Sequence, residues 1–102
     1  DNKRQYDRAI EDYNRAIALD PNDALTYYNR GGAYGKKGEY DRAIEDYNKA
    51  IALNPNDAKA YALRGLAYDI KGNMGRAISD LQKACDLGYE KACVFLYEIR
   101  KR

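Results

Sequence analysis

The chain has 102 residues, which fits one small domain with a modest hydrophobic core. Hydrophobic residues make up 45% and charged residues 33%, with a net charge of only +2, so the composition lacks the strongly basic character of a nucleic-acid-binding protein. No apolar run approaches the roughly 18 residues that a membrane span needs. We therefore expect neither nucleic acid nor a membrane span among its interactions.

Apolar and small residues recur at helical spacing along the whole chain, and no segment alternates as a strand would. The first stripe runs from Tyr6 to Leu19 and ends before Pro21, since proline cannot continue a helix. Asp23 and Asp57 are suited to cap the helices that follow them. The pattern predicts six antiparallel helices joined by short loops, at about 6–19, 24–37, 40–53, 58–71, 74–86 and 90–101.

Two of these segments are nearly the same sequence. Tyr6–Asp23 and Tyr40–Asp57 lie 34 residues apart and are identical at sixteen of eighteen positions. Similarity at one fixed period is the sequence signature of a stacked helical repeat. Such an array leaves an extended surface free, and the usual task of that surface is binding.

The repeat resembles the tetratricopeptide repeat (TPR), a helix–turn–helix unit of 34 residues. The residues that carry the resemblance are the first-helix set Tyr27, Gly31, Tyr34, Tyr61, Gly65 and Tyr68, and the second-helix set Tyr40, Ala43, Tyr47, Ala50 and Pro55. The resemblance covers almost the whole chain. It implies an all-α fold, a right-handed superhelical stack of antiparallel helix pairs.

The resemblance also implies how a single domain, residues 1–102, is divided. Residues 1–23 form a partial repeat with only its second helix, 24–57 a full repeat, 58–91 a full but divergent repeat, and 92–102 the rest of a capping helix with a polar outer side. The apolar face of Tyr6–Leu19 then lacks one neighbour. We expect either upstream residues or another chain to cover it.

In this family the first helix of each unit lines the ligand groove. Carried over, the groove residues are Leu25, Tyr28, Asn29, Gly32, Lys36, Lys59, Ala62, Leu63, Leu66 and Asp69, with Leu96 and Arg100 as additions from the capping helix. Some members grip C-terminal carboxylates with an asparagine and basic residues. Asn29 and Lys59 take two of those places, but Leu63 takes a third, so we expect a general peptide groove instead.

Cys85 and Cys93 lie in KACDLGYEKAC, which resembles cysteine-linked helical repeats of bacterial secreted proteins. That resemblance implies a disulfide between neighbouring helices, and the protein would then be periplasmic or secreted. The alternative is two buried thiols in a reducing cytoplasm. The compartment stays open. A zinc site is not expected, because the chain has two cysteines and no histidine.

No pattern for enzyme chemistry or a cofactor is present. The acidic residues of the second helices have basic residues three or four positions away, the spacing of solvated ion pairs. We therefore expect Glu11, Asp12, Glu45 and Asp46 to form a solvated face with Arg8, Arg15, Arg42 and Lys49.

The sequence thus predicts a non-enzymatic scaffold that binds a peptide or protein partner in its groove. The alternative is self-assembly, in which copies stack end to end or exchange repeat helices through the exposed face of Tyr6–Leu19.

Overall fold

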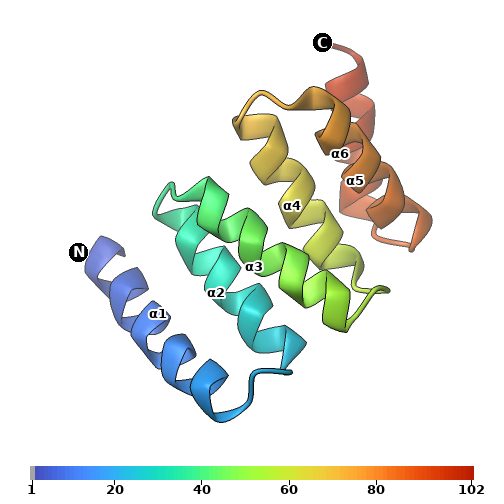
Figure 1. Ribbon diagram of the computed structural model, residues 1–102. Coiled ribbons are helices and arrows are strands. Elements are labelled where there is room, and N and C mark those ends of the chain that lie inside the picture. The colour runs from blue at the N-terminus through green and yellow to red at the C-terminus, as the bar shows by residue number, and fades with distance from the viewer. Residues whose placement is uncertain (1) are drawn as a thin grey trace. The chain divides into compact units, whose positions relative to one another are not determined.

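The computed structural model describes residues 2–102, and this part of the chain contains six helices and no strand (Figure 1). They are α1 (Asn2–Leu19), α2 (Ala24–Lys36), α3 (Tyr40–Leu53), α4 (Ala58–Ile70), α5 (Met74–Asp86) and α6 (Glu90–Arg100). The predicted all-α fold is confirmed, with α1 extending ahead of Tyr6 to Asn2. Asp1 lies outside the described residues, and the division into repeats stays a prediction.

The helix ends follow from local chemistry. The carboxylate of Asp23 accepts a hydrogen bond from the backbone N–H of Leu25 at 3.1 Å, and Asp57 caps α4 in the same way. At the other end of α2, Gly38 adopts a left-handed φ of 81°, which a glycine reaches without steric cost. Gly72 and Gly88 repeat this turn after α4 and α5. The loops are therefore short, and within each of the two halves of the chain, α1 to α3 and α4 to α6, successive helices run antiparallel (Figure 1).

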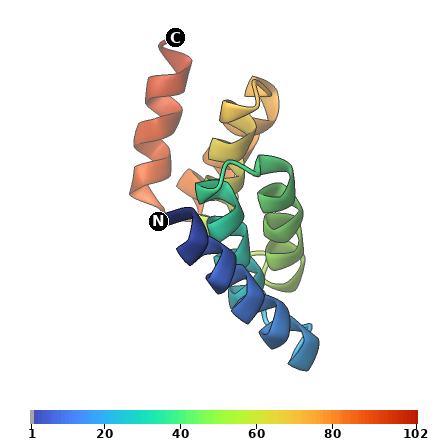
Figure 2. The same cartoon turned by 90° about the vertical axis from the view of Figure 1, so that its left-hand side faces the viewer.

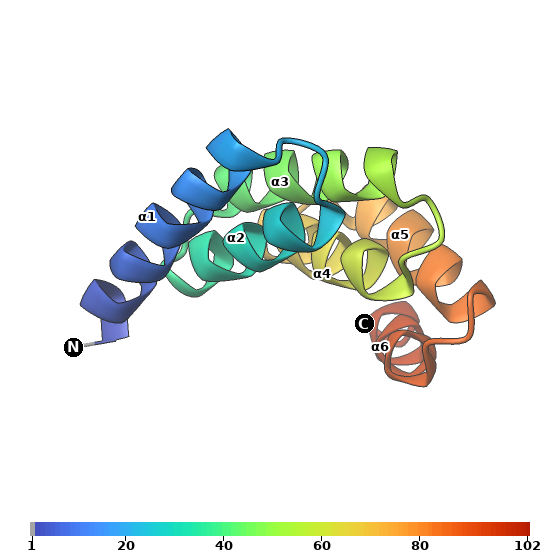
Figure 3. The same ribbon diagram turned by 90° about the horizontal axis from the view of Figure 1, so that it is seen from below.

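The chain divides into two compact units, Asp1–Pro55 with α1 to α3 and Asn56–Arg102 with α4 to α6. In the first unit, α2 packs against both α1 and α3, as can be followed in Figure 3. Arg30 of α2 joins the three helices, because its guanidinium donates to Asn14 of α1 at 2.9 Å and to Asp46 of α3.

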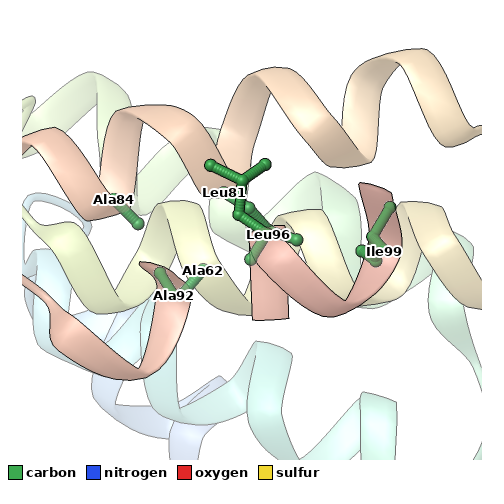
Figure 4. Packing of buried hydrophobic residues seen from close by; sticks show 6 residues of the cluster. All are labelled: Ala62, Leu81, Ala84, Ala92, Leu96 and Ile99. Atoms are coloured by element: carbon green, nitrogen blue, oxygen red, sulfur yellow. The ribbon is translucent and has the colours of Figure 1, made fainter. Parts of the chain in front are cut away.

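In the second unit, small and branched residues from all three helices form the core (Figure 4). Leu81 of α5 is fully buried at its centre, and α6 closes over it. The cluster consists of Ala62, Leu81, Ala84, Ala92, Leu96 and Ile99. α6 is therefore part of the core of this unit.

A buried ion pair joins α2 to α3, and another joins α4 to α5. Arg30 donates to both carboxylate oxygens of Asp46, at 2.7 and 2.9 Å, and Arg64 pairs with Asp80 at 2.7 and 2.8 Å. The hydrogen bond to Asp46 raises the pKa of Arg30. The prediction that Asp46 belongs to a solvated face is therefore wrong, because Asp46 is buried and its partner Arg30 lies on another helix.

Two glycines let these helix pairs come close. A Cβ on Gly31 would lie 2.8 Å from Cε1 of Tyr47 and 3.2 Å from Cβ of Asp46. Gly65 stands in the same place on α4, where a Cβ would lie 3.1 Å from Asp80 and Leu81 atoms. The arginine and the glycine that follows it thus contact the next helix together, and this contact recurs 34 residues later in the chain.

We expect Asp46→Asn to lower the free energy of unfolding by about 2–3 kcal/mol, since it leaves the guanidinium of Arg30 partly buried without a counter-charge. Asp12→Asn is the matched control. Asp12 stands at the same repeat position, but its side chain is 70% exposed, and its ion pair with Arg15 is an exposed contact within α1. Its loss should change stability by less than about 0.5 kcal/mol. Urea denaturation measures both, and equal losses would contradict the assignment.

Gly31→Ala and Gly32→Ala should shift stability in opposite directions. A Cβ on Gly31 meets the ring of Tyr47, which is buried and cannot move aside, and overpacking of this kind costs roughly 1–3 kcal/mol. A Cβ on Gly32 meets nothing within 4 Å, so the higher helix propensity of alanine should add about 0.5–1 kcal/mol. Thermal unfolding of the two variants tests this. The same sign for both would contradict it.

Candidate functional site

Five predicted groove residues form one stripe along α2. Their spacing, at positions 25, 28, 29, 32 and 36, places them on one face of the helix, away from the buried Tyr27 and Gly31. The side chain of Leu25 is 63% exposed, which is high for a large apolar residue, and Lys36 is also exposed. Between them lie the half-buried Tyr28, Asn29 and Gly32. We call these five residues the α2 stripe.

Tyr28 is both a surface and a packing residue. Its ring centroid lies 6.1 Å from that of Tyr47 on α3, at a tilt of 55°. Burial raises the pKa of Tyr47, so its phenol stays neutral well above the usual range. Removing Tyr28 would disturb this buried neighbour. Leu25 and Lys36 are therefore the better positions at which to probe the stripe.

Two neighbouring lysines, Lys36 and Lys37, lie at the C-terminal end of the stripe, and they differ in their ion pairs. Lys37 Nζ binds Asp7 of α1 at 2.5 Å and Glu39 at 2.9 Å. These contacts, the one with Asp7 first, raise the pKa of Lys37. Lys37 therefore serves the packing of α1 on α2, while the neighbouring Lys36 extends from the exposed face.

The predicted residues of α4 do not share one environment. Lys59 is exposed, and Leu63 and Leu66 are half-buried. Ala62 was expected in the groove, but this is wrong, because Ala62 is 3% exposed and packs in the core formed with α6. Asp69 is held by Arg102, whose guanidinium donates to its carboxylate at 2.9 Å.

Several exposed apolar residues of the second unit were not predicted from the sequence. Ile70 is 59% exposed and stands at the repeat position of Lys36. On α6, Leu96 was expected to face a ligand but is buried in the core, whereas Val94, Phe95 and Tyr97 are exposed. The outer side of α6 is thus not the polar surface that was predicted. The sequence does contain a signal for this exposure: on a helix that buries Ala92 and Leu96, the apolar residues at positions 94, 95 and 97 point to other sides.

Cys85 of α5 and Cys93 of α6 are joined by a disulfide, with their Cα atoms 4.8 Å apart. They are the two cysteines of the chain. The bond ties α6 to α5 beside the core cluster, against which Cys85 packs. Within residues 2–102 no cluster of acidic, histidine or cysteine side chains is arranged to hold a metal ion, and no helix is both long and apolar enough to cross a membrane.

Reduction of the disulfide should destabilise the second unit. The bond joins cysteines that lie eight positions apart in the sequence, and for so short a loop chain entropy predicts a loss of about 2–3 kcal/mol. Thermal unfolding with and without a phosphine reductant measures the effect. The Cys85→Ala, Cys93→Ala double variant should match the reduced protein and not respond to reductant. An unchanged melting curve for the wild type would contradict the prediction.

Family models match most of the chain. Two described as tetratricopeptide repeat match residues 24–57 and 46–79, and one described as TPR repeat matches residues 3–38. A search of curated proteins finds no match.

Solved structures agree with these matches. A crystal structure of MamA is 40% identical with a TM-score of 0.80, over 86% of this chain and 52% of that chain, so this chain spans about half of its length. The second TPR of Spaghetti (RPAP3), bound to the HSP90 peptide SRMEEVD, is 40% identical with a TM-score of 0.79, over 80% and 76%.

The second TPR domain of human RPAP3, in complex with the HSP70 peptide SGPTIEEVD, is 38% identical with a TM-score of 0.88, over 95% of this chain and 82% of that domain. The identity and coverage of these domains, together with the family models, settle the class of protein. This chain belongs to the tetratricopeptide repeat family.

Proposed function

We propose that this chain is a non-enzymatic interaction module whose α2 stripe binds a peptide segment of a partner protein. The observation that carries the proposal is the exposure of Leu25 on a helix whose other side is fully engaged with α1 and α3. Exposed large apolar side chains beside polar ones are typical of recognition surfaces. The relatives support this, since both RPAP3 domains are bound to peptides.

The stripe indicates the kind of peptide. Leu25 and Lys36 are eleven residues apart, or roughly 16 Å along the helix axis. An extended peptide spans that distance with about five residues. We therefore propose a ligand with an apolar side chain at one end and a carboxylate side chain about five residues away.

The residues between these ends suit a peptide backbone. Nothing lies within 4 Å of a Cβ built on Gly32, so a ligand main chain can approach α2 closely there. The Asn29 side chain offers both a donor and an acceptor for backbone groups. Leu63 stands where a basic residue would be needed to grip a terminal carboxylate. We therefore propose an internal acidic segment, not a free C-terminus, as the ligand.

The test uses a pool of eight-residue peptides that carry Leu or Phe and, five positions away, Glu. Fluorescence anisotropy should show binding to the wild type and at least a fivefold weaker affinity for Leu25→Asp, because the apolar anchor is lost. Lys36→Glu should abolish binding of the Glu-containing peptides. The same variant should gain affinity for a pool in which Lys replaces Glu. Both variants should keep their melting temperature, since these positions are exposed.

Leu19→Asp is the matched control, because Leu19 is 88% exposed but lies on α1, outside the stripe. Its affinity for the acidic pool should equal that of the wild type. No binding of either pool, or equal losses for Leu25→Asp and Leu19→Asp, would contradict the proposal.

A further inference from the structure

The second unit carries a stripe on α4 whose chemistry differs from that of the α2 stripe. It stands 34 residues after four members of the α2 stripe and consists of Lys59, Leu63, Leu66 and Ile70. Lys59 and Ile70 are exposed, and the two leucines are half-buried. The order of charge and apolar character is reversed, because the basic residue now comes first and three apolar residues follow it. We call these four residues the α4 stripe.

The α4 stripe is separate from the core of its own unit. Within the described residues 2–102, the core cluster and the apolar residues packed against it include Ala62 but none of the stripe. α6 lies on one side of α4 (Figure 2), where it covers Ala62 and holds Asp69 through Arg102. On the other side of the stripe, Ala60 and Ala67 are buried. The stripe therefore runs between two packed sides of α4, and its own residues stay at least partly exposed.

The spacing of the stripe is that of a contact between two helices. Its residues are separated by four, three and four positions. Side chains at this spacing form one row along a helix, and in a coiled coil the branched apolar side chains of a second helix interdigitate with such a row. The α2 stripe has the same spacing but places Asn29 and Gly32 in the middle of the row. Only α4 therefore presents one half of an apolar helix–helix contact.

The middle of the α4 stripe suits a helix better than an extended peptide. An extended ligand would lay its backbone N–H and C=O groups over Leu63 and Leu66, which offer them no hydrogen-bond partner. Buried backbone groups without a partner are costly. A helix satisfies these groups internally, so it can bury its apolar side chains against the two leucines without that cost.

The charge at the start of the stripe adds a second requirement. Lys59 is exposed, and its amine forms no ion pair within residues 2–102. The neighbouring carboxylate of Asp57 is used as a helix cap, where it accepts hydrogen bonds from the backbone N–H groups of Lys59 and Ala60 at 3.1 and 3.3 Å. An acidic residue on the ligand would complement this amine. Acidic residues are favoured in the first turn of a helix, so the ligand helix runs in the direction of α4.

We infer that the α4 stripe is a second docking surface and that its occupant is an amphipathic helix of a partner protein. The helix presents apolar side chains at positions i, i+3 and i+7 toward Leu63, Leu66 and Ile70. An acidic residue four positions earlier pairs with Lys59. The inference adds a ligand class to the proposed function and does not depend on the α2 stripe, since it uses residues of the second unit alone.

The probe is a synthetic peptide of about 18 residues, held helical by a lactam bridge because a free helix of this length is marginally stable in water. It carries Glu, Leu, Leu and Ile at the spacing of the α4 stripe, with alanine and glutamine at the other positions. We expect fluorescence anisotropy to show that it binds the 102-residue chain. A probe without the bridge and with proline at its centre should bind at least tenfold more weakly, because it cannot form the helix.

Ile70→Lys should weaken binding of the probe at least fivefold, because it removes the apolar end of the stripe. Val94→Lys is the matched control, since Val94 is 61% exposed, close to the 59% of Ile70, but lies on α6. Its affinity for the probe should stay within twofold of the wild type. Lys59→Glu should weaken binding of the probe and strengthen binding of a probe in which Lys replaces Glu. All three variants should keep their melting temperature, since these positions are exposed.

Leu25→Asp separates this inference from the function proposed for the α2 stripe. It should weaken binding of the acidic peptide pool and leave binding of the helical probe unchanged. The inference is overturned if the helical probe does not bind, if the proline probe binds equally well, or if Ile70→Lys and Val94→Lys have equal effects. Equal or tighter binding of a peptide of residues 89–102, which contains α6, would also overturn it, by making a second copy the occupant.

Discussion

A buried contact between an arginine–glycine step and an aspartate joins α2 to α3 and α4 to α5. Arg30 donates to both carboxylate oxygens of Asp46, and Gly31 brings α2 close enough for this to happen. A buried ion pair contributes little net stability against an apolar core, but it excludes alternatives, since any other register leaves a charge buried alone. The contact therefore acts mainly on the specificity of helix packing, and it determines which face of α2 is covered by α3.

The surfaces open to partners follow from that constraint. Because Tyr27, Arg30 and Gly31 turn one side of α2 toward its neighbours, the opposite side carries Leu25 and Lys36 outward. In the second unit α6 takes part in the core, buries Ala62 and holds Asp69 through Arg102. The two units therefore differ in chemistry at equal repeat positions, as Lys36 and Ile70 show.

Much of the fold was predictable from the sequence. Pro21, Asp23 and Gly38 mark helix ends by backbone chemistry alone, so the helix bounds were nearly right. Helical spacing also placed the α2 stripe on one face. The errors concern contacts between helices: Asp46 has basic neighbours three and four residues away, yet it pairs with Arg30, sixteen residues away. Spacing within one helix cannot reveal a partner on another helix. Ala62 was placed wrongly for the same reason, because its burial depends on the packing of α6 against α4.

A double-mutant cycle on the Arg30–Asp46 pair tests the central claim most directly. The cycle with Arg30→Met and Asp46→Asn should give a coupling free energy of about 1–3 kcal/mol from urea denaturation, as expected for neighbours in one buried contact. The same cycle on Arg15 and Asp12 should give less than about 0.5 kcal/mol. A coupling near zero at Arg30–Asp46, or equal values at the two sites, would contradict the account.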